Sequence, residues 1–205
     1  FAKRSTETPQ ANRLFAMAIL LASSVMFPRL VLEIAFVNQA LMRHIAVPLG
    51  VMGATGFLLG YFLYRRARDQ ATGEVSVRFD NPFSLQSAIA FSLVFAVILM
   101  VTRLATTYLG TSWLPVVALV SGLTDADAIA FSISALQQSN LISLDWGSFN
   151  LVLGAISNTF MKLFLVFGLG HRVLFRQLLV SFLIITLVAI LTMVFSYDLG
   201  AIFLK

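Results

Sequence analysis

The sequence contains no cysteine, only two histidines and few charged residues. Charged side chains make up 11% of its 205 residues, whereas hydrophobic side chains make up 59%. The absence of thiols excludes disulfide bonds, thiolate metal sites and cysteine nucleophiles, and two histidines argue against a histidine-based metal site. A soluble domain of this length would not carry so much apolar surface. The composition therefore predicts an all-α integral membrane protein.

Common catalytic and nucleotide-binding signatures are also absent. The chain has no Gly-x-Ser-x-Gly, no His-Glu-x-x-His and no Gly-x-x-x-x-Gly-Lys sequence. We therefore expect no enzyme activity and no cofactor other than a bound cation. The net charge of +5 does not indicate nucleic-acid binding, because the basic residues lie beside apolar segments, where they set membrane topology.

Six apolar segments are long enough to span a bilayer, and they form a single polytopic domain over residues 1–205. A polar loop at residues 65–86 follows the second segment. The positive-inside rule then places both termini and this loop in the cytoplasm, because most basic residues fall on that side and only Arg43, Arg172 and Arg176 fall outside. The expected spans are residues 13–37, 45–64, 87–109, 112–136, 147–169 and 173–197.

The fourth span carries two carboxylates near its midpoint, those of Asp125 and Asp127. A charge at that depth costs about 2.5–3.5 kcal/mol on insertion scales. Gly122 weakens a helix, and Thr124 followed by Asp127 is similar to a capping box. We therefore expect a transmembrane helix broken near Gly122–Asp127 that restarts near Thr124. On a regular helix the two carboxylates would point about 200° apart, so both can line one site only if the backbone is irregular.

Hydroxyl, amide and amine groups of the fourth and fifth spans complete the expected site. Carboxylate, hydroxyl and amide oxygens suit a hard cation such as Na⁺ or Mg²⁺, and a neighbouring lysine suits proton-coupled exchange. In the alternative interpretation, the carboxylates only cap the helix or pair with a buried basic residue. Arg29 and Glu33, four residues apart in the first span, are expected to form a structural or gating ion pair. The expected ion- or substrate-binding residues are Asp125, Asp127, Ser121, Thr124, Asn158, Thr159 and Lys162.

These observations leave two functions open. The first is a membrane transport protein that moves an ion or small solute through the midplane site. The second is a non-transporting membrane module that regulates or scaffolds a partner protein. Besides the lipid bilayer, the expected partners are further copies of this chain in a homo-oligomer.

The first and fifth spans match at an offset of 133 residues. Ala22–Leu30 lies over Ala155–Leu163 with identical Ala, Ser, Phe and Leu residues, and Arg29 lies over Lys162. This match indicates an internal duplication. In the six-span topology the repeat unit would contain four spans. Because four is an even number, both repeats would begin on the same side of the membrane and would be parallel. The counterpart of the fourth span would then precede residue 1.

Four motifs follow one another along the chain: Leu21–Arg29, Asn81-Pro82-Phe83, Leu119–Ile129 and Ser157–Lys162. In this order they resemble a bacterial membrane domain that follows an MgtC/SapB domain and is catalogued as domain of unknown function 4010. The resemblance covers nearly the whole chain and implies a bacterial inner membrane and an upstream MgtC-like region as a partner. In that family a Gly-Leu-x-Ser-Ser-Thr helix commonly precedes the stretch matched here by Lys3-Arg4-Ser5, so we expect the chain to lack its N-terminal part.

Overall fold

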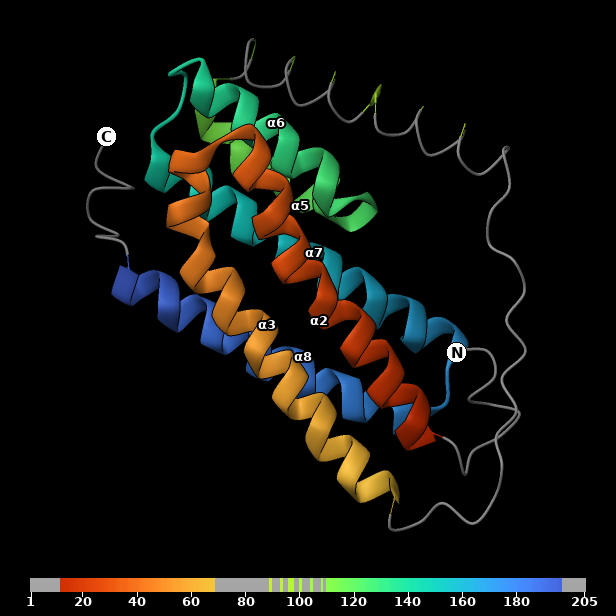
Figure 1. Cartoon of the computed structure of the whole chain (residues 1–205). Coiled ribbons are helices and arrows are strands. Elements are labelled where there is room, and N and C mark those ends of the chain that lie inside the picture. Colours follow the sequence, from red (N-terminus) through yellow and green to blue (C-terminus); the bar gives the residue numbers. More distant parts are fainter. Residues whose placement is uncertain are drawn as a thin grey trace.

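The structure is a computed structural model that describes residues 12–68 and 110–196, with isolated positions between 89 and 108. Over these residues it is all-helical and contains no strand (Figure 1). A short 3₁₀ turn, η2 (Thr111–Trp113), directly precedes helix α5. The α-helices are α2 (Asn12–Val37), α3 (Gln39–Arg68), α5 (Leu114–Thr124), α6 (Ala126–Gln138), α7 (Leu144–Leu169) and α8 (Arg172–Ser196).

Four of these helices, α2, α3, α7 and α8, are long and apolar enough to cross a membrane. Three of them match the expected first, fifth and sixth spans closely. The expected turn at residues 38–44 shrinks to Asn38, whose side chain accepts a hydrogen bond from the Leu41 amide at 3.0 Å and so caps α3. The expected third span and most of the 65–86 loop lie outside the described residues.

Glycines on α3 allow close packing against α2. A Cβ on Gly56 would lie 2.0 Å from the Ser24 hydroxyl oxygen, and one on Gly60 would lie 2.6 Å from Leu21. Gly53 faces α2 in the same way, whereas Gly50 has no neighbour within 4 Å and takes no part. The large buried side chains of the core, among them Phe27 of α2 and Phe182 of α8, lie between the long helices.

Helix α5 runs in the same direction as α7. At its start, the Trp146 indole nitrogen donates to the Thr111 carbonyl oxygen at 3.2 Å. Near its end, the Asn158 amide donates to the Gly122 carbonyl oxygen at 3.0 Å. Residue numbers therefore rise together along the two helices, and α5 enters the bundle beside the first half of α7.

Helix α6 runs in the opposite direction. A Cβ added to Gly154 of α7 would lie 2.9 Å from the Ile129 side chain, near the start of α6. A Cβ added to Gly147 of α7 would lie 3.4 Å from the Ile133 side chain, one turn later in α6. Residue numbers therefore rise along α6 as they fall along α7. Helices α5 and α6 form an antiparallel hairpin that turns at Asp125 (both green in Figure 1).

This hairpin corrects the expectation of one span over residues 112–136. Helix α5 has 11 residues and α6 has 13, so they are about 16 and 20 Å long and each is shorter than the roughly 30 Å hydrocarbon core. Thr124 also does not begin the second helix, because it is the last residue of α5 and Asp125 is the N-cap of α6. Apolar composition is the same for a helix that continues after a break and for one that turns back, so the sequence did not separate them.

A hairpin that does not cross the bundle changes which segments share an end. The Arg13 guanidinium donates to the Arg66 carbonyl oxygen at 3.3 Å, and Asn12 contacts His171 at 3.2 Å. The start of α2, the end of α3 and the start of α8 therefore meet at one end of the bundle. We call this the basic end, because it carries Arg13, Arg65, Arg66, Arg172 and Arg176.

The described helices differ from a six-span arrangement in which ends they share. Arg172 and Arg176 lie at the same end as Arg13, not at the opposite one. Asn12 and Ser196 lie at opposite ends of the described bundle. Both differences arise because a fourth crossing was expected where the chain turns back. The side of the membrane on which each terminus lies stays a prediction.

The boundaries of the helices repeat at nearly the same offset of 133 residues as the sequence match. Helices α2 and α7 each have 26 residues, and α3 begins at Gln39 while α8 begins at Arg172. Helices α2 and α7 are antiparallel, since Lys162 contacts Met26 and His171 contacts Asn12. The pairs α2–α3 and α7–α8 are thus inverted with respect to each other, and not parallel as the six-span count predicted.

We predict that Gly122→Ala destabilises the protein by about 1–3 kcal/mol, the usual range for overpacking a tight contact. A Cβ on Gly122 would lie 2.4 Å from the Gly154 carbonyl oxygen, and both groups belong to backbone that cannot move without shifting α5 from α7. Thermal unfolding in detergent measures the effect. Gly168→Ala, at a position with no neighbour within 4 Å, is the matched control. Equal melting temperatures for the two variants would contradict the packing described here.

Candidate functional site

A polar cavity of about 330 Å³ lies where the α5–α6 hairpin turns. Helix α2 forms one wall, the start of α6 another and α7 the third. Two basic groups, two carboxylates and one amide reach it from three separate parts of the chain. The lining residues are Ala22, Val25, Met26, Arg29, Asp125, Ala126, Asp127, Asn158 and Lys162.

Arg29 joins α2 to the first turn of α6. Its Nη2 atom lies 2.6 and 2.5 Å from the two carboxylate oxygens of Asp127. Its Nε atom lies 3.5 Å from Glu33, so the expected pair on α2 is present, but Asp127 is the closer partner. The Asp127 side chain is 17% exposed and that of Arg29 is 53% exposed. One guanidinium therefore balances two carboxylates at the edge of the cavity.

Asp125 is the extended residue between the two short helices. Its Oδ1 atom accepts from the Asp127 amide at 2.9 Å and caps α6, while its own amide donates to the Ser121 carbonyl oxygen at 2.8 Å. Its Oδ2 atom is buried and has no hydrogen-bond partner among the described residues. An unpaired buried carboxylate oxygen is costly, and it is a ready acceptor for water, a proton or a cation.

This extended residue meets the condition that the sequence set for a shared site. Asp125 and Asp127 would diverge on a regular helix, but here the first precedes the helix and the second lies in its first turn. Both line the same cavity. The α6 N-terminus also points its free amides toward this region, which favours negative charge there.

Helix α7 satisfies the backbone at the end of α5. The last carbonyls of a helix have no partner within it, and inside a bilayer each unpaired one costs several kcal/mol. Asn158 donates to the Gly122 carbonyl oxygen, which is one of these, and the Ser157 hydroxyl donates at 2.6 Å to the Leu119 carbonyl oxygen one turn earlier, inside α5. Ser157 was not among the expected site residues. Its polarity in an apolar span, directly before Asn158, is the signal that could have identified it.

Lys162 lies on α7 at the far side of the cavity. The contact of its amine is the Met26 sulfur at 3.5 Å, a weak acceptor. No carboxylate of the described ranges lies within 4.0 Å of the amine. Of the alternative roles for the carboxylates, capping is seen at Asp125 and pairing with a basic residue, Arg29, is seen at Asp127, whereas Lys162 forms no such pair among the described residues.

Three of the expected residues do not line the cavity. Thr159 is buried and donates to the Ala155 carbonyl of its own helix at 2.9 Å, because successive helical residues point about 100° apart. Ser121 is buried within α5, and Thr124 is exposed at the end of that helix. The apolar wall from Ala22, Val25, Met26 and Ala126 was not anticipated, although Met26 lies one helical turn before Arg29.

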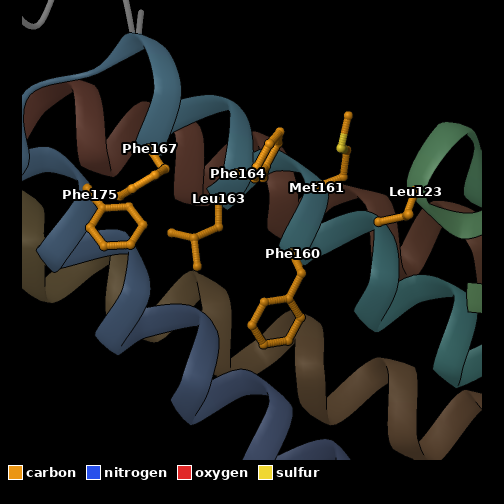
Figure 2. A pocket seen from close by; sticks show the side chains of 7 residues that line it. All are labelled: Leu123, Phe160, Met161, Leu163, Phe164, Phe167 and Phe175. Carbon is orange, nitrogen blue, oxygen red and sulfur yellow. The ribbon is translucent and has the colours of Figure 1, made fainter.

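A larger cavity, of about 610 Å³, lies beside the polar one but carries no comparable chemistry. Figure 2 shows its lining, which is entirely apolar and comes from aromatic and aliphatic side chains of α7, Phe175 of α8 and Leu123 of α5. Within the described ranges, no three carboxylate or imidazole groups are close enough to hold a metal ion.

We predict that Arg29 and Asp127 are energetically coupled. Either Arg29→Gln or Asp127→Asn leaves the other charge without its partner, so the double variant should be more stable than the sum of the single effects implies, by about 1–3 kcal/mol. Unfolding in detergent of the wild type, both single variants and the double variant gives this coupling. Arg43→Gln with Asp127→Asn is the control cycle and should be additive. Additivity of the Arg29 cycle would contradict the pairing.

Comparison with known proteins agrees with the resemblance seen in the sequence. The family model described as "Domain of unknown function (DUF4010)" matches residues 1–170. An uncharacterized protein of Aquifex aeolicus (strain VF5) is 25% identical over 207 residues, covering 100% of this chain and 86% of the relative. No solved structure matches the chain significantly. The link to MgtC/SapB proteins and the missing N-terminal part stay predictions. Since the family model covers α2, the hairpin and α7, the chain belongs to the DUF4010 family.

Proposed function

We propose that this protein transports an ion or small solute across the bacterial inner membrane through the polar cavity at the hairpin turn. The observation that carries the proposal is that two charged side chains without an ion-pair partner among the described residues line the same cavity. The Asp125 carboxylate offers an unpaired oxygen, and the Lys162 amine has no carboxylate partner among the described residues.

The hairpin itself supports a ligand site. Two short helices that end inside a bilayer expose backbone groups that a continuous helix would pair internally, and such breaks are tolerated where they are buried in protein or line a cavity. Here Asn158 binds the Gly122 carbonyl in the last turn of α5, and Asp125 caps the start of α6. Broken helices of this kind form the ion and substrate sites of many transporters.

The inverted helix pairs support movement around that site. Helices α2–α3 and α7–α8 correspond at the same offset but run in opposite directions. Arg29 and Lys162 occupy equivalent positions in the two pairs and face one cavity. Inverted repeats give a transporter two related conformations, each open to one side of the membrane.

The charges of the cavity limit the class of solute. A volume of about 330 Å³ has room for on the order of ten water molecules, enough for a hydrated ion or a small solute but not for a lipid or a peptide. The Asp125 carboxylate attracts a cation, whereas Lys162 and the α6 N-terminus attract an anion. The cavity therefore suits either an ion exchanged against a proton or a small solute that carries both charges.

The basic end sets the orientation that we propose. Arg13, Arg65, Arg66, Arg172 and Arg176 gather there, whereas Arg43 lies at the opposite end. The positive-inside rule then places the basic end in the cytoplasm, and the hairpin enters from the other side. This arrangement removes the two exceptions, Arg172 and Arg176, that a six-span topology leaves outside.

The second function, a non-transporting module that regulates or scaffolds a partner, predicts a sealed cavity with paired charges. The Arg29–Asp127 pair fits that description, but Asp125 and Lys162 do not. Flux measurements separate the two functions directly.

We predict that Asp125→Asn and Lys162→Met each reduce flux to background in liposomes, because each removes one of the two charges that the solute would meet. Influx of H⁺, Na⁺, K⁺ and Mg²⁺, and of a small zwitterion, is followed with the purified protein. Asp145→Asn is the matched control, since this carboxylate lies in the first turn of α7, away from the cavity. Wild-type flux in Asp125→Asn, or no flux of any probe with a folded wild type, would contradict the transport proposal.

A further inference from the structure

A second polar feature lies outside the transport cavity, at the basic end. A groove of about 590 Å³ runs between the last turns of α3 and the first turns of α8. Arg66 and Arg176 stand at its mouth together with Gln177, while Phe62, Val180 and Ile184 line the part farther from the mouth. The groove therefore has a cationic mouth and an apolar floor.

The two arginines at the mouth lack a carboxylate partner within the described part of the chain. The carboxylates described there are Glu33, Asp125 and Asp127, which lie at the transport cavity, and Asp145, which lies at the opposite end beside His44. The Gln177 Oε1 atom is buried and also has no hydrogen-bond partner among the described residues. The mouth thus offers two guanidinium groups to an anion and one amide oxygen to a hydroxyl donor.

The dimensions of the groove suit a molecule with a tail. Arg176 and Ile184 are separated by about 12 Å along α8, at the ordinary rise of an α-helix. Val180 and Phe62 are more than half exposed along this length, so the floor is an open apolar surface. Arginines at the end of a membrane helix commonly reach the headgroup region, and basic pockets between helices on the cytoplasmic side bind anionic headgroups.

From these features we propose that the groove binds one anionic glycerophospholipid of the cytoplasmic leaflet. The phosphate lies between Arg66 and Arg176, a headgroup hydroxyl donates to Gln177, and an acyl chain follows Val180 and Ile184. Because the lipid would bridge the inverted pairs through α3 and α8, it would stabilise their contact. This site is separate from the transport cavity and does not depend on transport, but its assignment to the cytoplasmic leaflet rests on the orientation proposed above.

Native mass spectrometry of the protein in detergent tests the site, with phosphatidylglycerol as the probe and phosphatidylcholine as the neutral reference. The proposal predicts one tightly retained phosphatidylglycerol. Arg66→Gln with Arg176→Gln should weaken its binding by about tenfold to thirtyfold, as expected for two basic residues beside an anionic headgroup. Arg65→Gln with Arg172→Gln, which removes the same two charges at the same end but outside the groove, should leave binding nearly unchanged.

A second variant keeps the test decisive if the double arginine variant does not fold. Val180→Trp fills the apolar floor and leaves both arginines in place, so it should also reduce retention of phosphatidylglycerol. Free glycerol phosphate should not compete, since it lacks the tail. Equal retention in Val180→Trp, displacement by glycerol phosphate, or equal retention of the neutral lipid would overturn the proposal.

Discussion

The structure depends on satisfying the backbone where α5 ends and α6 begins. Inside a bilayer an unpaired carbonyl or amide has no water to bind, so a helix can stop there only if other groups supply hydrogen bonds. Asn158 of α7 binds the Gly122 carbonyl in the last turn of α5, and the Asp125 side chain binds the Asp127 amide in the first turn of α6. Ser157 of α7 adds a second bond to α5 at the Leu119 carbonyl. The close approach of Gly122 to Gly154 brings α5 near enough to α7 for these bonds.

Because the hairpin turns back, it adds no crossing, and this has three consequences. The basic residues at the starts of α2 and α8 and at the end of α3 gather at one end of the bundle. The two homologous-looking helix pairs become inverted. The Asp125 carboxylate comes to lie inside the bundle, between Arg29 of one pair and Lys162 of the other. The proposed transport site and the proposed orientation therefore follow from the same local turn.

Much of this architecture could be predicted from the sequence. The boundaries of α2, α7 and α8 follow from apolar runs of bilayer length, and the Arg29–Glu33 pair follows from its helical spacing. The group formed by Asp125, Asp127, Asn158 and Lys162 was expected from the rarity of polar groups within spans, and the structure brings these four residues to one cavity.

The remainder depends on contacts between distant segments. Asp127 pairs with Arg29 across 98 residues, and no local pattern indicates that partner. The direction of α6 depends on where Ile129 and Ile133 meet α7, and an apolar face carries no information about direction. Thr159 was included among the expected site residues because it is polar. Its hydroxyl instead donates to a carbonyl of its own helix, so a polar residue in a span need not face a cavity.

The hairpin is the central claim, and cysteine labelling tests it most directly, since the natural chain has no cysteine to interfere. Single cysteines at Ser112, Ser139 and Arg172 occupy exposed positions before the hairpin, after it and at the basic end. A membrane-impermeant thiol reagent is applied to oriented vesicles. The account predicts that Ser112→Cys and Ser139→Cys react from the same side and Arg172→Cys from the other. Reaction of the Ser112 and Ser139 variants from opposite sides would show that this segment crosses the membrane and would contradict the account.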